Sequence, residues 1–514
     1  MPQSPATVFE TAAALPDDAP VVVVLKALRQ GFGKQTSALD TKTGGTLSRA
    51  CTAPGFSGKS GECLDIVAPN GLAARRVVVL GLGDPVAMTP LSVTRAGADL
   101  AAFLENKGEN DTTIVVDTIE NAALADAELA ARLALGMRLK RYRFDLRNKR
   151  PGAAAEAGWV VRFAGLQGKD CGAALTRMNA VADGVEFART LVNLPANILH
   201  PGSFLEHLGP LREAGIEIET LDDTELKRLG MNALLAVGSA SVHPPRVIVL
   251  RYRGENDPGE PLAFVGKGVC FDSGGLCAKT GPQMFDMKGD MAGAAAVAGL
   301  LLALARQGSK VDAVGVLGIA ENLPSGKSYK SGDVITTLSG QTVEVFDTDC
   351  EGRMLLADCL YYTATRFKPS AIVDLATLTY SVMRGLGSVF AGLFSNDDAI
   401  ASSMIAAGEA VGERFWRMPL DHAYDEGLQS PLADLRQHAR NLEDGDAPYA
   451  AAFLRNFTDN RPWVHLDIAG KEFSDADGPL GRQGGTGFGV QMLEQWVCAV
   501  EAGKRAIAAS DTAM

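Results

Sequence analysis

Three carboxylates alternate in the sequence just before a helical pattern. In residues 345–360, VFDTDCEGRMLLADCL, the acids Asp347, Asp349 and Glu351 are separated by single residues. In extended backbone alternate side chains point the same way, so these acids are expected on one face. Gly352 then allows a sharp change of direction, and apolar residues at three- and four-residue spacing predict a helix after it. The pattern suits a hard metal ion at a strand end, although a solvated acidic turn would have the same sequence.

The chain is long enough for two domains. It has 514 residues, of which 46% are hydrophobic and 21% charged, as is typical of a globular protein. One hydrophobic core rarely grows beyond about 250–300 residues, so two cores are expected. No apolar run reaches the roughly 18 residues of a membrane span, and residues 1–18 lack the pattern of a secretory signal. We therefore expect a cytoplasmic protein without a membrane partner.

The cysteines and histidines do not form a familiar metal-binding pattern. The eight cysteines include no CxxC pair, which argues against a zinc ribbon and against a disulfide framework. The six histidines include no HExxH motif. A metal ion in this protein would therefore be held mostly by oxygen.

Negative charge is concentrated in the later part of the chain. The net charge is −12, yet residues 1–165 contain 19 Lys and Arg against 17 Asp and Glu. The acidic remainder disfavours non-specific binding to nucleic acid. Arg138–Arg150 holds seven basic residues and one acid, interleaved with Tyr142 and Phe144. This run is either a patch for anions or nucleic acid or a solvated surface loop, and we favour the loop.

The first region alternates apolar strands with helices, which predicts a small α/β domain. Gly81 and Gly83 are similar to the start of a dinucleotide-binding fingerprint, but Val86 stands where its third glycine belongs, so a tight strand-to-helix turn is expected instead. We place the domain boundary near residue 168, with residues 169–192 as a connecting helix. The expected strands are 21–28, 76–80 and 113–116, and the expected helices are 94–106 and 122–139.

The second region, residues 193–514, continues the alternation of strands and helices. Its helix at 291–306 is so rich in Ala and Gly that another element is expected to pack very close to it. The other expected helices are 201–208 and 223–229, and the expected strands are 246–252, 262–265, 313–319, 342–346, 371–375 and 464–468.

A second polar cluster lies in residues 266–290, GKGVCFDSGGLCAKTGPQMFDMKGD. Lys267 and Asp272 fall at the end of an apolar strand, Lys279 lies in the following loop, and Asp290 starts the Ala-rich helix. Together with the last two acids of the first stretch, the chain can place four carboxylates and two lysines around one point. Such carboxylates would repel one another, and this repulsion would raise their pKa values. Two divalent ions would neutralise them and could activate a water molecule.

These motifs resemble the leucyl aminopeptidase family of two-metal enzymes, also called cytosol aminopeptidases. The stretches GKGVCFDSGG, MKGDMAGAA and DTDCEGRMLLADCL match in order and spacing, and LVNLPAN, PPRVIVLRY, DLATLT and HLDIAG match as well. The likeness covers most of residues 185–490 and is weaker before them. It implies an α/β fold with two domains, a smaller N-terminal α/β domain (1–168) and a larger C-terminal α/β/α catalytic domain (193–514) with a mixed central sheet.

The resemblance also implies the roles of individual residues. Lys267, Asp272, Asp290 and Glu351 would bind one metal ion, and Asp272, Asp349 and Glu351 the other. A lysine ligand must lose its proton, which two nearby dications favour. Lys279 would hydrogen-bond the substrate carbonyl and the developing oxyanion. Arg353 would hold a bicarbonate thought to act as general base. Met287, Asp347, Thr377 and Leu378 would contact the substrate, and an apolar first residue such as Leu would fit.

The implied reaction is the release of N-terminal residues from peptides. The free α-amine would bind one metal ion, and a hydroxide bridging both ions would attack the first carbonyl. Oxygen ligands with one lysine suit Mn²⁺ or Zn²⁺, and also Mg²⁺ or Co²⁺. The family assembles as homohexamers, and we expect one here.

Three positions depart from the family pattern. Asp347 replaces the usual Asn, Cys350 replaces Ala, and Tyr380 replaces Gly after ATLT. The extra carboxylate could alter metal preference, and the tyrosine ring could narrow the substrate site. No expected metal ligand or catalytic cation is missing.

Other functions are also compatible with parts of the sequence. A DNA-binding or regulatory protein would rely on the basic run Arg138–Arg150. A catalytically inactive homologue is disfavoured because all seven matching positions are present. A different two-metal reaction, such as phosphomonoester hydrolysis, would leave Lys267 unexplained.

Overall fold

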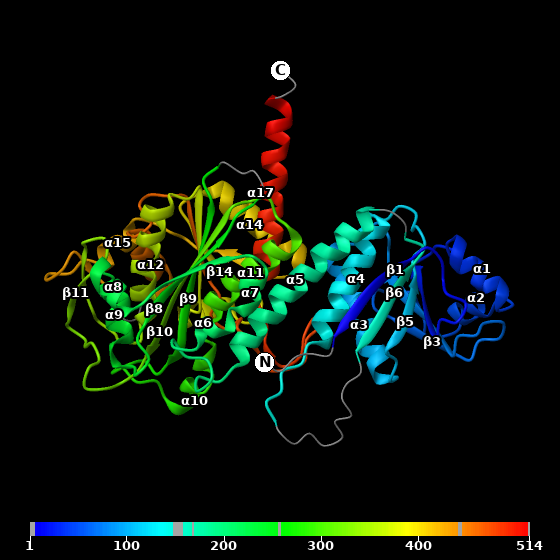
Figure 1. Ribbon diagram of the computed structural model, residues 1–514, viewed down its shortest axis with the longest axis horizontal. Coiled ribbons are helices and arrows are strands. Elements are labelled where there is room, and N and C mark those ends of the chain that lie inside the picture. Colours follow the sequence, from blue (N-terminus) through cyan, green and yellow to red (C-terminus); the bar gives the residue numbers. More distant parts are fainter. Residues whose placement is uncertain are drawn as a thin grey trace. The chain divides into compact units, whose positions relative to one another are not determined.

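The computed structural model describes residues 6–147, 158–166, 169–254, 259–439, 441 and 445–511 (Figure 1). The chain forms two compact units. The first comprises Met1–Ala182 with Asp475–Gln483, and the second comprises Asp183–Ser474 with Gly484–Met514. The division therefore falls inside helix α5 (Lys169–Asn193). The domain boundary near residue 168, with residues 169–192 as a connecting helix, stays a prediction.

The first unit is built on a six-stranded sheet with the order β1-β6-β5-β2-β4-β3. Its strands run parallel except β3, which pairs antiparallel with β4 at one edge. The predicted small α/β domain is thus confirmed. The elements are β1 (Thr7–Ala12), β2 (Val21–Ala27), α1 (Lys34–Lys42), α2 (Thr46–Cys51), β3 (Cys63–Val67), β4 (Arg76–Gly83), α3 (Pro90–Asn106), β5 (Asp111–Val115), α4 (Asp126–Arg141) and β6 (Trp159–Ala164).

The expected turn at Gly81 and Gly83 is wrong, because β4 continues through both glycines. A Cβ atom on Gly81 would lie 2.2 Å from the backbone oxygen of Lys59. These glycines therefore reflect a close approach of backbone to the strand. Helix α3 begins only at Pro90, where Thr89 Oγ1 accepts a hydrogen bond from Ser92 N at 3.1 Å.

The basic run is only partly the solvated loop that we favoured. Residues 142–147 are an irregular segment that is exposed at Leu146 and Arg147, but residues 138–141 continue a helix. Helix α4 extends to Arg141, whose guanidinium is buried and lies 4.0 Å from the ring centroid of Trp159. Lys140 donates to the Gly478 carbonyl at 2.7 Å, and Arg143 pairs with Glu105. These cations are already bound within the chain, which weakens the nucleic-acid interpretation. Residues 148–150 lie outside the described residues.

The second unit is built on an eight-stranded mixed sheet with the order β15-β14-β17-β13-β9-β10-β8-β7. The four central strands, β17, β13, β9 and β10, run parallel to one another. The predicted mixed central sheet is confirmed. The strands of this sheet are β7 (Glu217–Leu221), β8 (Arg246–Tyr252), β9 (Leu262–Asp272), β10 (Ala313–Asn322), β13 (Ala371–Ala376), β14 (Ala391–Ser395), β15 (Phe415–Arg417) and β17 (Trp463–Asp467).

The unit also contains two small sheets and many helices. The small sheets are β11 (Val334–Thr336) with β12 (Thr342–Glu344) and β16 (Leu435–Arg436), and β18 (Phe473–Ser474) with β19 (Gly484–Gly485). The helices are α6 (Phe204–His207), α7 (Gly209–Glu213), α8 (Asp223–Leu229), α9 (Asn232–Val237), η1 (Gly238–Ala240), α10 (Gly281–Met284), η2 (Met287–Gly289), α11 (Ala292–Gln307), α12 (Glu351–Phe367), α13 (Tyr380–Leu386), α14 (Asp398–Val411), α15 (Ala423–Gly427), α16 (Asp446–Arg455) and α17 (Val490–Asp511).

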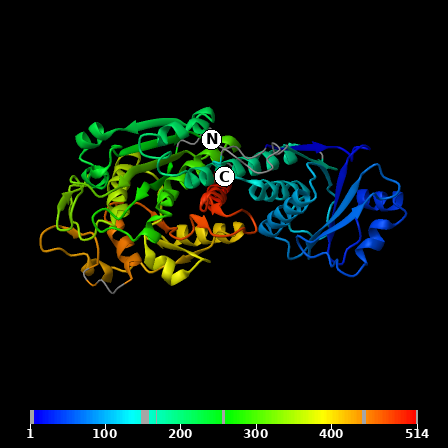
Figure 2. The ribbon, with the colours of Figure 1, turned by 90° about the horizontal axis from the view of Figure 1, so that it is seen from below.

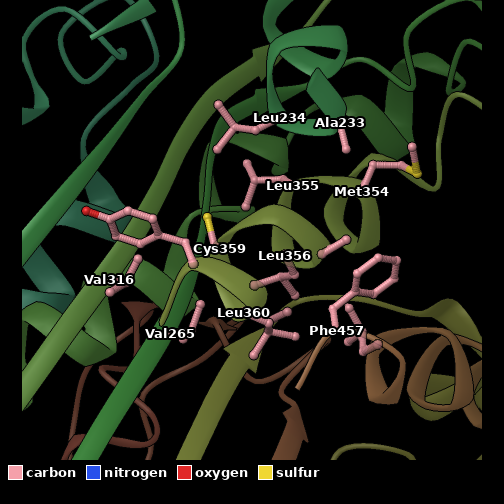
Figure 3. Close-up of a cluster of buried hydrophobic side chains, with 14 of the residues drawn as sticks. Ala233, Leu234, Val265, Val316, Met354, Leu355, Leu356, Cys359, Leu360 and Phe457 are labelled. Atoms are coloured by element: carbon pink, nitrogen blue, oxygen red, sulfur yellow. The ribbon is translucent and has the colours of Figure 1, made fainter. Parts of the chain in front are cut away.

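Helices cover both faces of the large sheet (Figures 1 and 2), and the side chains that alternate between these faces along β9 and β10 are almost all buried. A Cβ on Gly266 would lie 2.5 Å from Ala294 Cα, so this face of β9 touches α11. Val265 and Val316 point to the other face, where they join the hydrophobic cluster with Leu355 of α12 (Figure 3). The Ala- and Gly-rich α11 thus allows the close packing expected from its sequence.

One described stretch has the length and composition of a membrane span. It is Gly281–Gln307, and 89% of its most apolar window is buried inside the protein. Burial against β9 explains the apolar composition of this segment.

Candidate active site

A cavity of about 560 Å³ lies at the carboxyl ends of the central strands, where ligands commonly bind in α/β sheets. β9 ends at Asp272, and Thr377 follows directly after β13. All but one of the residues predicted to form the site line this cavity. They are Lys267, Asp272, Lys279, Met287, Asp290, Asp347, Asp349, Glu351, Thr377 and Leu378.

The acids in residues 347–351 come together through a turn and a helix start, not through the extended backbone that we expected. β12 ends at Glu344, and Cys350 N donates to the Asp347 carbonyl at 3.1 Å, so this segment is a turn and not extended backbone. Asp347 Oδ1 also accepts from Asp349 N at 2.8 Å. Glu351 begins α12. The turn and the helix start, not strand alternation, bring Asp349 and Glu351 to the same cavity.

Gly352 does not change the chain direction either, because it lies inside α12. A Cβ atom there would lie 2.8 Å from Lys267 Cε and 2.9 Å from Leu378 Cδ1. The missing side chain makes room for the Lys267 stem.

Lys267 stands at the centre of the buried charges. Its Nζ lies 2.7 Å from Asp290 Oδ1 and 2.8 Å from Glu351 Oε1, and it donates to the Thr377 carbonyl at 2.9 Å. Burial alone would lower the pKa of Lys267, but the surrounding carboxylates outweigh burial and raise it. The ammonium group is thus held in place by two of its predicted partners in metal binding.

Lys279 forms a second buried ion-pair group. Its Nζ lies 2.9 Å from Asp272 Oδ2 and also pairs with Asp349. Burial opposes the charge, but the carboxylates of Asp272, Glu351 and Asp349 raise the pKa of Lys279. The ring centroid of Tyr380 lies 5.3 Å from Nζ, so the unusual tyrosine covers this lysine.

Two carboxylate oxygens in the cluster have no hydrogen-bond partner among the described residues. They are Asp290 Oδ2 and Glu351 Oε2, both buried. Burial raises the pKa of both groups, and of Asp349 to about 7. Ligand atoms of Asp272, Asp290 and Glu351 lie within 4.8 Å of one another. Unsatisfied carboxylate oxygens at this spacing, beside an amine, fit hard divalent ions.

Several residues that the sequence analysis missed support the predicted ligands. Asn322, the last residue of β10, donates to Asp272 Oδ1 at 2.8 Å and to the Thr348 carbonyl at 2.9 Å. Tyr329 donates to the same carbonyl at 2.9 Å. In the sequence, the only indication of a role for Asn322 is that a polar residue ends an otherwise apolar strand.

Hydrogen bonds to Asp467, the last residue of β17, hold the loop after β13 in place. Asp467 Oδ1 accepts from Leu378 N at 3.0 Å, and Oδ2 accepts from Thr379 Oγ1 at 2.7 Å. Thr377 Oγ1 in turn donates to Asp290 Oδ1 at 2.7 Å. Thr377 therefore connects Asp290 and Lys267 through its hydroxyl and its carbonyl.

Arg353 is the predicted site residue that does not line the cavity. It is 1% exposed, and Nη1 donates to the Gln437 carbonyl at 2.9 Å and to Asp446 Oδ1 at 3.0 Å. Nη2 pairs with Asp446 Oδ2. This fork-to-fork pairing occupies the Nη1–Nη2 edge of the guanidinium. Nε has no hydrogen-bond partner among the described residues, but it is buried, and Arg353 does not line the cavity from which an anion would enter. The structure therefore does not fit the predicted bicarbonate at Arg353.

Cys350, His438 and Asp446 form a second group whose ligand atoms lie within 4.8 Å of one another. His438 Nε2 lies 3.5 Å from Asp446 Oδ1. Burial raises the pKa of the Cys350 thiol well above its usual value, so it is not a reactive thiolate. With Arg353 already paired to Asp446, this group is a poor cation site.

Family comparisons cover both units. The description "Cytosol aminopeptidase family, N-terminal domain" matches residues 21–150, and "Cytosol aminopeptidase family, catalytic domain" matches residues 186–494. A probable cytosol aminopeptidase of Agrobacterium fabrum is 42% identical over 463 residues, covering 90% of this chain and 92% of that protein. One from Caulobacter vibrioides is 43% identical over 467 residues, covering 90% and 93%.

Solved structures agree with these relatives. A tomato leucine aminopeptidase mutant is 31% identical with a TM-score of 0.82, covering 97% of this chain and 98% of that one. The bottromycin maturation enzyme BotP in complex with Mn is 32% identical with a TM-score of 0.80, covering 94% and 100%. The chain thus belongs to the cytosol aminopeptidase family and is an aminopeptidase, a hydrolase that acts on peptides.

Proposed function

We propose that this aminopeptidase depends on two divalent metal ions and preferentially releases N-terminal Leu and other apolar residues. The observation that carries the proposal is the buried cluster at the end of β9. There Asp290 Oδ2 and Glu351 Oε2 have no partner among the described residues, while Lys267 lies between the two side chains. Such a cluster is costly to bury unless cations complete it.

Five residues would hold the ions. Lys267, Asp272, Asp290 and Glu351 are proposed for one ion, and Asp272, Asp349 and Glu351 for the other. Bound there, the ions would supply an ionised water and polarise the scissile carbonyl. Lys267 would have to give up its proton to bind, since an ammonium group has no lone pair. Mn²⁺ and Zn²⁺ are the proposed ions. Mn²⁺ is supported by the similar enzyme BotP, whose structure is solved in complex with Mn.

Lys279 would stabilise the charge that develops on the carbonyl oxygen. The Lys279 side chain is 5% exposed yet lines the cavity, so the field of its ammonium group acts in a poorly solvated space. A donor aimed at the developing oxyanion contributes to rate more than to substrate binding. Lys279 would donate to the substrate oxygen once the ions have taken over Asp272 and Asp349.

The substrate pocket is proposed on the apolar part of the cavity wall. Met287 and Leu378 offer apolar surface there, and Thr377 and Asp347 complete the wall. An α-amine needed for binding would restrict cleavage to the first residue. Acetylated peptides would then be inert.

Assembly and location are also proposals. We propose a homohexamer, as the family resemblance implies, and a cytoplasmic location, which the names of the cytosol aminopeptidase relatives support. Sedimentation that finds only monomers would contradict the hexamer.

The test is hydrolysis of Leu-p-nitroanilide by protein stripped of metal and titrated with Mn²⁺ or Zn²⁺. Activity should return with metal, and N-acetylated substrate should stay intact. Lys279→Met keeps the side-chain stem and should lower kcat about 10²–10³-fold, the size found for loss of one oxyanion donor. Folded, oligomeric protein that stays inactive with either metal would contradict the proposal.

A further inference from the structure

The guanidinium of Arg353 already holds a carboxylate of the same chain. Nη1 and Nη2 both contact Asp446, and Nη1 also contacts the Gln437 carbonyl. Arg353 is 1% exposed and the Asp446 side chain is 20% exposed, so this ion pair is largely shielded from water. A soluble anion would have to displace a partly buried, doubly hydrogen-bonded partner.

Asp446 also lies between Arg353 and the cavity. Asp446 and Gly445 line the cavity, whereas Arg353 does not. The wall at this point is therefore formed by the carboxylate. Its neighbours there include His438, whose Nε2 is 3.5 Å from Asp446 Oδ1.

We propose that Asp446 is a built-in replacement for a soluble anion at Arg353, so that this aminopeptidase neither binds nor needs bicarbonate. The inference rests on the proposed function, because it assigns Asp446 to the wall of the same active site. Asp446 acts as a positioning residue, since it pairs with Arg353 and its carboxylate forms the cavity wall at that point.

The fold holds Asp446 in place independently of Arg353. Asp446 is the first residue of α16, where a negative charge interacts favourably with the helix dipole. Ala447 N, the next along, donates to Ser381 Oγ at 2.7 Å. Helix α12 carries Arg353, and side chains of α12 and α16 share one hydrophobic cluster. The carboxylate is thus fixed by packing and capping, as a permanent ligand of Arg353 requires.

A purely structural ion pair between α12 and α16 is the alternative. That role would make Asp446→Ala less stable, but it would not create an anion site. A second ion pair of α16 offers a matched control, because Arg455 Nη2 lies 2.7 Å from Asp425 Oδ1. Asp425→Ala removes a carboxylate that pairs with α16 but does not contact Arg353, so it tests the loss of an ion pair alone.

The experiment measures melting of the full-length protein in CO₂-free buffer while bicarbonate or formate is added. A ligand that binds only the folded state raises the melting temperature. Asp446→Ala should show a saturable rise with either anion, because removal of the carboxylate leaves Arg353 exposed to a small anion. Wild type and Asp425→Ala should show none. Asp446→Asn, which keeps the site filled, should also show none. If the alanine variant does not fold, the wild type decides the test, because a rise of its melting temperature with bicarbonate would overturn the inference.

Activity gives the second readout. Wild-type hydrolysis should be unchanged in CO₂-free buffer, and Asp446→Ala should lose about 10–100-fold and regain most of it with bicarbonate. A bicarbonate response of the wild type, or an alanine variant that responds to neither anion, would overturn the inference. Melting is measured without substrate, so it tests the anion site independently of catalysis. If the melting temperatures change as expected but the wild type and all variants are inactive, the result contradicts the proposed function and not this inference.

Discussion

At the scale of single residues, Thr377 connects two proposed ligands of one metal ion. Its hydroxyl donates to Asp290 Oδ1 at 2.7 Å, and its carbonyl accepts from Lys267 at 2.9 Å. Thr377→Val removes the first contact and keeps the second. We expect metal affinity to fall about 10–100-fold, as is usual when a partner of a metal ligand is removed.

Competition with a fluorescent chelator measures this change. Thr363→Val is the control, because Thr363 Oγ1 is fully buried in α12 and donates to the Cys359 carbonyl at 2.6 Å. It should keep wild-type metal affinity. Equal affinities of the two variants would contradict the role given to Thr377.

The sequence could identify the charged residues of the site but not what holds them. Lys267, Asp272 and Lys279 were predicted from one local motif, and the structure brings them to one cavity. Asn322 and Asp446 were missed, because each contacts its partner across 50 or more residues and no local spacing records such a contact. Arg353 was predicted as an anion site, since its partner Asp446 lies in a polar stretch without a motif.

At the scale of elements, α5 and α11 touch through glycines. A Cβ on Gly184 would lie 2.3 Å from the Gly299 carbonyl oxygen, whereas one on Gly172, in the same helix, meets nothing within 4 Å. Gly184→Ala should therefore lower stability by about 1–3 kcal/mol through overpacking. Gly172→Ala should raise it by roughly 0.5–1 kcal/mol, because alanine is the better helix former. Calorimetric melting that ranks Gly184→Ala at or above Gly172→Ala would refute this contact.

Helix α17 is capped by a buried glutamate from another part of the chain. Glu413 Oε2 accepts from Gly489 N at 3.1 Å and from Met492 N at 2.9 Å. Burial raises the pKa of Glu413 to about 7, against about 4.3 in an unfolded chain. Between these values the folded state binds the proton and the unfolded state does not. The contribution of Glu413 to stability therefore falls as pH rises from about 4 to about 7.

Glu413→Gln should remove this dependence, because the amide oxygen still accepts both hydrogen bonds and carries no charge. The free energy of unfolding of the variant, relative to that of the wild type, should rise by roughly 2 kcal/mol between pH 5 and pH 8. Melting temperatures at both pH values measure the gain. A difference that does not change with pH would contradict the raised pKa.

Regular elements were predicted best where apolar runs were long. The expected strands 246–252 and 371–375 and the expected helix 223–229 match β8, β13 and α8 closely. The strand expected at 262–265 continues to Asp272, because polar residues such as Lys267 are buried by their charge partners and not by hydrophobicity. The turn at 347–350 was mistaken for strand, since alternation of acids does not require extended backbone.

At the scale of the whole molecule, both units match the same family, in the order in which they occur in the chain. The prediction of two α/β domains with a mixed sheet in the second is confirmed. Segment Asp475–Gln483 belongs to the first unit although it lies far along the chain, and sequence patterns gave no sign of this. Such a return of the chain depends on tertiary contacts that composition does not record.

The central claim is that the cavity binds two divalent ions per subunit. Mass spectrometry of metal content, after equilibrium dialysis against Zn²⁺ or Mn²⁺, tests it most directly. The wild type and Thr363→Val should each hold two ions per subunit, and Asp349→Ala should hold one, because Asp349 is assigned to a single ion. A wild type with one ion or none, or an Asp349→Ala variant that keeps both, would contradict the two-metal site.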